Sequence, residues 1–200
     1  MPRMTRLEKK IQTRNKLVEA AKVEFSNSGF YGCSVDTIAE TAGFSKGAFY
    51  SHFKTKEDIF LVLLEDHMSE EAQQISSVLN STTNELEDIV SSLLDSQAES
   101  PENNQWKFLC IELALFAHRN SEFGSKYTAL QESHTKKLCE LIETYFQNMG
   151  INPPVEAKLL AEAFISLLLG LKVSCFSSDE DTDERKKSIV KLFVSGLIDK

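Results

Sequence analysis

The stretch from residue 34 to residue 53 constrains the fold most, because it reads as two short helices around a tight turn. Ser34 is placed to cap the first helix, Gly43 to end it, and Ser45 to cap a second helix over residues 46–53. The first helix has one buried face formed by Val35, Ile38, Ala39 and Ala42. This spacing predicts a helix-turn-helix.

The second helix of this pair has two different faces. At about 100° per residue, Phe49 and Phe53 point toward the first helix. The opposite arc is small, polar and basic, and it holds Lys46, Gly47, Tyr50 and Ser51. Such a face suits the major groove of DNA, where Gly47 allows close approach and Lys46 donates hydrogen bonds. An ordinary amphipathic helix pair has the same spacing, so both interpretations stay open.

Two lysines stand at the start of the next predicted helix. Lys54 and Lys56 flank Thr55, which fits the first position of a capping box. Cations are unfavourable at the positive end of a helix dipole unless an anion such as a DNA phosphate lies there. The alternative is that both lysines are simply solvated.

The segment from about residue 14 to residue 64 resembles the DNA-binding domain of the TetR family of bacterial transcriptional repressors. The residues that match the pattern of that family are Phe25, Gly29, Ile38, Ala39, Ala42, Gly43, Ser45, Gly47, Tyr50, His52, Phe53 and Lys56. The resemblance implies DNA contacts from Ser45, Lys46, Gly47, Tyr50 and His52, and phosphate contacts from Thr37 and Lys56. Phe44 and Ser51 depart from the residues commoner in the family at those positions, so no contact is assigned to Ser51.

Charge is unevenly distributed along the chain, although the net charge of the whole is −8 at pH 7. Residues 1–56 hold ten Lys or Arg against five Asp or Glu, a net charge of +5. The remaining residues hold twelve against twenty-five, a net charge of −13. The basic part is the part predicted to bind DNA. Its first residues read either as a flexible DNA-binding arm or as a disordered tail: Arg3, Arg6, Lys9 and Lys10.

Targeting signals and metal motifs are not evident. The N-terminus has no apolar segment, and the longest apolar run, 163–171, is too short to span a bilayer, so we expect a cytoplasmic protein without membrane contact. The cysteines lie far apart without a CxxC pair, which favours ordinary thiols over a disulfide, zinc or redox-sensing role: Cys33, Cys110, Cys139 and Cys175. No cofactor is expected.

The rest of the chain has helical periodicity and no alternating strand pattern. A first helix is expected to begin after Thr5 and to end at Gly29, and a long connector helix is expected over residues 56–79. Five more helices are expected near 84–99, 105–119, 125–149, 155–176 and 184–198. The prediction is an all-α protein of about nine helices, with a DNA-binding domain over residues 1–54 and a ligand-binding and dimerisation domain over residues 55–200.

The segment 106–117 is apolar around almost its whole circumference, which is typical of a helix enclosed by others. Five of its side chains are candidates for lining a ligand cavity, with plain core packing as the alternative: Trp106, Phe108, Leu109, Leu113 and Phe116. Glu112 is either a partner for a cationic ligand group or a residue on the one exposed edge.

Small side chains form a row on the next-to-last helix at Ser166, Gly170 and Ser174. A groove of this kind allows close approach of another helix. With Leu192 and Ser195 on the last helix, it predicts a homodimer interface, and packing within one subunit is the alternative.

Together these features predict a ligand-responsive transcriptional regulator, most simply a repressor, that binds a palindromic double-stranded DNA operator as a dimer and responds to a small, mostly apolar effector. A regulator without such an effector is the first alternative. An all-α enzyme is the second, but the chain has no ExxH, HExxH, GxGxxG, Walker or GxSxG motif.

Overall fold

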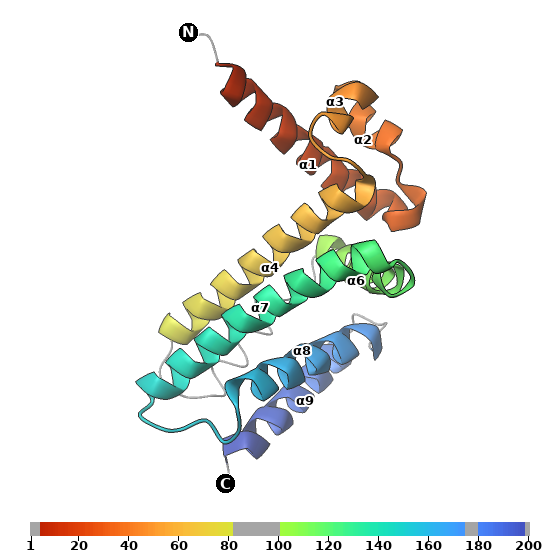
Figure 1. Cartoon of the computed structure of the whole chain (residues 1–200). Coiled ribbons are helices and arrows are strands. Elements are labelled where there is room, and N and C mark those ends of the chain that lie inside the picture. Colours follow the sequence, from red (N-terminus) through yellow and green to blue (C-terminus); the bar gives the residue numbers. More distant parts are fainter. Residues whose placement is uncertain (1–4, 82–100, 175–179, 199–200) are drawn as a thin grey trace. The chain divides into compact units, whose positions relative to one another are not determined.

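The computed structural model describes residues 5–81, 101–174 and 180–198, and this part of the chain holds eight helices and no strand (Figure 1). The prediction of an all-α protein is confirmed. The helix expected near 84–99 lies outside the described residues.

The chain divides into two compact units. Unit 1 consists of Met1–His67 and Asn104–Tyr127, and unit 2 consists of Met68–Asn103 and Thr128–Lys200. Three helices therefore contribute residues to both units: α4 (Lys56–Ser81), α6 (Pro101–Arg119) and α7 (Ser121–Asn148). The predicted functional boundary after residue 54 stays a prediction, because compactness groups part of α6 and α7 with the N-terminal helices.

Helix α1 (Arg6–Gly32) begins with the expected cap and contains a kink. Thr5 accepts a hydrogen bond from the Glu8 amide, and the Glu8 carboxylate accepts one from the Thr5 amide, which completes a capping box. Gly29 has φ 71° and ψ 173°, a conformation that favours glycine. The first helical segment therefore ends at Gly29 as expected, but one more helical turn follows the kink, with the Cys33 amide bonded to the Gly29 carbonyl at 3.2 Å, so that α1 extends to Gly32.

Helices α2 (Val35–Thr41) and α3 (Lys46–Tyr50) form the predicted helix-turn-helix. Ser34 and Ser45 cap them by accepting hydrogen bonds from the amides of Thr37 and Ala48. Gly43, at φ 74°, makes the turn between them. Helix α3 is shorter than predicted, because residues 51 and 52 form a turn rather than continuing to Phe53.

An aromatic cluster, defined as Phe25, Phe30, Phe60, Phe116 and Phe123, forms much of the core of unit 1. The Phe30 ring lies 5.7 Å from that of Phe60 and 5.1 Å from that of Phe116, and Phe116 lies 5.1 Å from Phe123. Phe25 and Phe60 are 4.7 Å apart in an edge-to-face pair. The cluster thus joins α1, α4, α6 and the start of α7.

The ends of α6 and α7 differ from the predicted ones. A break between helices was expected over residues 100–104. This expectation is wrong for residues 101–104, because α6 begins at Pro101. The break expected over 120–124 is confined to Asn120, whose side chain accepts a hydrogen bond from the Phe123 amide and caps α7. The break after Gly150 is confirmed, and Gly150 has φ 67°.

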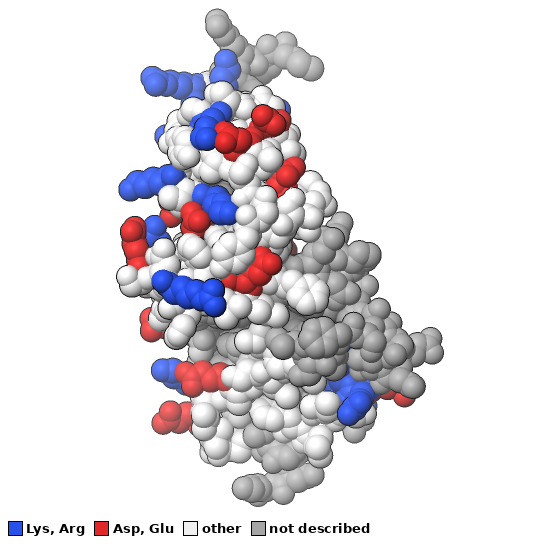
Figure 2. Space-filling model, turned by 90° about the vertical axis from the view of Figure 1, so that its right-hand side faces the viewer, with Lys and Arg blue, Asp and Glu red and all other residues white. Residues whose placement is uncertain are grey.

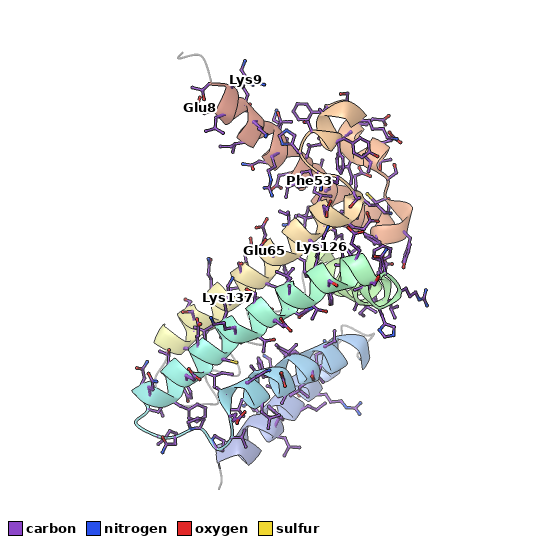
Figure 3. All side chains as sticks on the ribbon, viewed as in Figure 1. Glu8, Lys9, Phe53, Glu65, Lys126 and Lys137 are labelled. Atoms are coloured by element: carbon purple, nitrogen blue, oxygen red, sulfur yellow. The ribbon has the colours of Figure 1, made fainter. Side chains whose placement is uncertain are left out.

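Unit 2 contains the C-terminal parts of α4 and α7 together with α8 (Ala157–Ser174) and α9 (Glu180–Ile198). Lys137 on α7 points to α4, with its Nζ 3.5 Å from Ser69 Oγ (Figure 3). Among the residues with described structure, no helix is long and apolar enough to cross a membrane.

Candidate nucleic-acid interface

Helix α3 is held by its apolar face. Phe49 is fully buried and Phe53 is 6% exposed, as predicted, and their rings are 5.7 Å apart. Figure 3 shows Phe53 near α1 and the start of α4, and the Arg14 guanidinium of α1 lies over its ring at 5.3 Å. This anchoring decides which face of α3 is presented to solvent.

The solvent face of α3 carries the side chains predicted to contact DNA. Tyr50 is 51% exposed, and the side chain of Lys46 is 52% exposed. Ser45, Gly47 and Ser51 are exposed as well. The structure therefore brings together, on one surface, most of the residues that the resemblance implied.

Lys46 is paired with a residue that the sequence analysis did not assign to the site. Its Nζ donates to Oδ2 of Asp36 on α2 at 2.8 Å, and this hydrogen bond raises the pKa of Lys46. Both side chains are more than half exposed, and exposed pairs contribute little to stability. Lys46 can therefore exchange Asp36 for a phosphate or a base edge at small cost.

Thr37 and His52 border the same face. Thr37 is exposed, but its hydroxyl already donates to the Ser34 carbonyl at 2.8 Å and accepts from the Ser34 amide at 3.1 Å. Burial lowers the pKa of His52, and the nearby cations Lys10 and Arg14 lower it further. The part of α1 that carries these cations is helical from Arg6 onward, so the expectation of a flexible arm is wrong for Arg6, Lys9 and Lys10.

Lys56, the first residue of α4, is already engaged by the protein. Its Nζ donates to the Phe30 carbonyl at 2.7 Å and to the Cys33 carbonyl at 2.9 Å, and it lies 4.6 Å from the centre of the Phe30 ring. An ammonium has three N–H donors, so one is left for a phosphate. The predicted phosphate contact of Lys56 stays a prediction.

Most of the described residues predicted to line a ligand cavity on α6 pack into unit 1, whereas Phe108 is 54% exposed. Leu109 and Leu113 are 2% and 0% exposed, and Phe116 belongs to the aromatic cluster. Glu112 is partly buried and has a partner, because its Oε2 accepts a hydrogen bond from the Phe30 amide at 2.8 Å. The Trp106 side chain lies outside the described part, and the ligand cavity stays a prediction.

The residues predicted for the dimer interface lie on α8 and α9. Leu192 is 75% exposed, and Ser166, Gly170 and Ser195 are exposed too. The Ser195 hydroxyl donates to the Lys191 carbonyl of its own helix at 2.8 Å. The side chain of Ser174 lies outside the described residues.

Other candidate chemistry finds little support. In the described ranges, no cluster of His, Cys, Asp and Glu suits a metal ion, and Cys33, Cys110 and Cys139 form no disulfide. Burial raises the pKa of the Cys33 and Cys139 thiols, which keeps them in the less reactive protonated form. On the face shown in Figure 2, Lys and Arg side chains alternate with Asp and Glu rather than forming an unbroken basic patch.

Sequence reasoning missed one buried polar pair. His134 on α7 is 5% exposed, and its Nε2 lies 3.4 Å from Oε2 of Glu71 on α4. Glu71 and His134 are 63 positions apart in the sequence, and no motif links them. Their pairing depends on how α4 and α7 align.

Comparison with known proteins finds a family match for the helix-turn-helix segment. A family model described as bacterial regulatory proteins of the tetR family matches residues 17–63. The chain is similar to the HTH-type transcriptional repressor AcnR of Corynebacterium efficiens, with 28% identity over 121 residues, and the match spans 60% of this chain and 59% of that protein.

Solved structures share the fold over most of their length. A TetR transcription regulator from Haloarcula marismortui superposes with a TM-score of 0.70 at 17% identity, over 94% of this chain and 98% of that one. The fatty acid degradation regulator FadR from Bacillus halodurans superposes with a TM-score of 0.67 at 20% identity, over 92% and 96%. The relatives are regulators, which sets aside the alternative of an all-α enzyme. The capped helix pair, the matched N-terminal segment and the shared all-α fold lead to one conclusion: residues 17–63 are a helix-turn-helix segment of the kind found in the tetR family of bacterial regulatory proteins, and the described chain has the fold of TetR-family regulators.

Proposed function

We propose that this protein is a DNA-binding transcriptional repressor that binds an inverted-repeat operator as a homodimer and releases it when a small, mostly apolar ligand binds. The repressor AcnR among its relatives supports the direction of regulation. The protein acts on chromosomal DNA in the cytoplasm.

The observation that carries the DNA-binding proposal is the glycine in the middle of the exposed face of α3. Gly47 does not have a positive φ, and a Cβ built there meets only Ser45 Oγ at 3.8 Å, an ordinary contact. The fold therefore does not need glycine here, although glycine in a helix costs about 0.5–1 kcal/mol relative to alanine. A close external partner explains it, and Lys46 and Tyr50 on either side suit base edges and phosphates.

Exposed apolar side chains support dimerisation through the last two helices. Leu159 and Leu169 on α8 are 55% and 47% exposed, and Ile189 and Leu192 on α9 are 37% and 75% exposed. Covering such side chains removes apolar surface from water. A second copy is the occupant, since the two half-sites of an inverted repeat require two helix-turn-helix units related by a two-fold axis.

The buried His134 supports a ligand with one polar group. Its Nδ1 is buried and has no hydrogen-bond partner in the part of the chain that the structure describes. Nε2 faces the Glu71 carboxylate at 3.4 Å, which favours the tautomer with the proton on Nε2 and leaves Nδ1 as an acceptor. A hydroxyl or N–H group on an apolar molecule satisfies that acceptor, and so does a buried water molecule.

We expect Gly47→Ala to weaken operator binding about ten-fold, because a bidentate base contact worth about 1–3 kcal/mol is lost when the added methyl holds α3 away from the groove. The melting temperature of the variant stays the same or rises, since alanine favours the helix. Fluorescence anisotropy with labelled operator and circular dichroism measure the two effects. Unchanged affinity in both this variant and Tyr50→Ala would remove the outer face of α3 from the DNA interface.

Selection from a random duplex library with the wild-type protein is expected to enrich an inverted repeat. If the dimer makes roughly 6–10 phosphate contacts, affinity falls by about 10³–10⁵ between 50 and 200 mM salt. A scrambled duplex of the same length is the control and binds more weakly. Failure to enrich any sequence contradicts the proposed function.

Leu192→Glu is expected to convert the dimer to a monomer, because it places a charge in the apolar contact. Sedimentation velocity measures the mass. Leu115→Glu is the matched control, since Leu115 is 53% exposed but lies on α6. A dimer that persists in Leu192→Glu and dissociates in Leu115→Glu would move the interface away from α9.

The ligand proposal is tested with decanol and its methyl ether, an apolar pair chosen because one structural neighbour is a regulator of fatty acid degradation. Emission from the single tryptophan, Trp106, reports binding. One hydrogen bond to His134 Nδ1, worth about 1 kcal/mol, favours the alcohol over the ether by about five-fold, and His134→Phe removes the preference.

Saturating operator is expected to lower the affinity for decanol by about 5–150-fold, the range of common coupling energies. If the affinity is the same with and without operator, the coupling fails and a regulator without a small-molecule effector becomes the better description. Equal binding of alcohol and ether would assign a water molecule to His134 instead.

A further inference from the structure

The kink of α1 is held by a residue far from the helix-turn-helix in sequence. Phe30 follows Gly29, and its amide donates to Oε2 of Glu112 on α6 at 2.8 Å, across 82 residues of chain. The contact is partly buried, so solvent screens it less than an exposed pair. Glu112 lies well outside residues 17–63, the part that matches the family model.

The Glu112 carboxylate also fits the shape of the kink. A Cβ built on Gly29 would lie 3.3 Å from its Oε1 and 3.4 Å from its Oε2, and Gly29 has φ 71°. Both the conformation and the missing side chain of Gly29 thus suit a carboxylate at this place.

A cation binds the carbonyl group of Phe30. Lys56 at the start of α4 donates to the Phe30 carbonyl at 2.7 Å and to the Cys33 carbonyl at 2.9 Å. The Glu112 carboxylate therefore binds the N–H of Phe30, and the Lys56 ammonium binds its C=O. Helices α1, α4 and α6 are thus joined at one residue. Ser34, the cap of α2, directly follows Cys33.

We infer that Glu112 is a positioning residue for DNA binding: through the Phe30 amide it sets the direction in which α1 leaves its kink and enters the helix-turn-helix. Because Glu112 is carried by α6, a displacement of α6 acts on the kink through Glu112. This inference rests on the proposed DNA-binding function and assigns part of its regulation to one carboxylate.

The test uses the whole 200-residue chain and the duplex selected by the wild type. Glu112→Ala removes the acceptor, whereas Glu112→Gln keeps an amide oxygen at almost the same place. Glu132→Ala is the control, because Glu132 is an exposed glutamate on α7. Stoichiometric titration gives the active fraction of each variant, which separates a loss of folded protein from a change in Kd.

We expect Glu112→Ala to weaken operator binding about ten-fold, Glu112→Gln to recover most of this loss, and Glu132→Ala to bind like the wild type. The dependence of log Kd on log salt stays unchanged in Glu112→Ala, because no phosphate contact is removed. Hydrogen exchange at the Phe30 amide becomes faster in Glu112→Ala, which confirms that the intended hydrogen bond is lost.

Faster exchange at Phe30 with unchanged operator affinity overturns the inference and leaves Glu112 a purely structural residue. A reduced active fraction of Glu112→Ala with an unchanged Kd also overturns the inference. Failure of the proposed function is a different outcome: the wild-type protein then selects no duplex, while exchange at Phe30 still reports whether the hydrogen bond exists.

Discussion

The backbone of Phe30 is the point on which unit 1 depends. Glu112 accepts from its amide, Lys56 donates to its carbonyl, and its ring lies within the aromatic cluster. Hydrogen bonds to charged groups contribute roughly 1.5–3 kcal/mol each. Since the two charged groups come from α6 and α4, one peptide joins three helices, and the alignment of α1 with the helix-turn-helix follows from it.

The two faces of α3 differ in burial and in how strongly their contacts are held. Phe49 and Phe53 are buried and fix the helix, so a change there alters the core. Lys46 and Asp36 form an exposed pair that water already weakens, and Gly47 makes no contact that a methyl group would disturb. A helix that binds DNA requires a rigid buried face and an exposed face whose contacts rearrange easily, because the protein must exchange its own weak contacts for contacts with the duplex.

Unit 2 has two features that unit 1 does not explain, exposed apolar side chains and a buried imidazole nitrogen. Exposed leucines on α8 and α9 leave apolar surface in contact with water, and His134 leaves a buried nitrogen without a partner in the described part of the molecule. The first feature suits another copy of the chain, and the second suits a small polar group. Both lie outside residues 17–63, the part of the chain that matches the family model.

Local chemistry allowed the helix-turn-helix, its caps at Ser34 and Ser45, and the buried pair Phe49 and Phe53 to be predicted from the sequence, because capping and helical periodicity act over three or four residues. The same reasoning found the break at Gly29 but missed the helical turn that follows it, and it left Glu112 undecided between a ligand and the solvent. The partner of Glu112 is an amide 82 residues away. Only the tertiary structure brings that amide, the carboxylate and Lys56 together, because no local rule relates the positions of α1, α4 and α6.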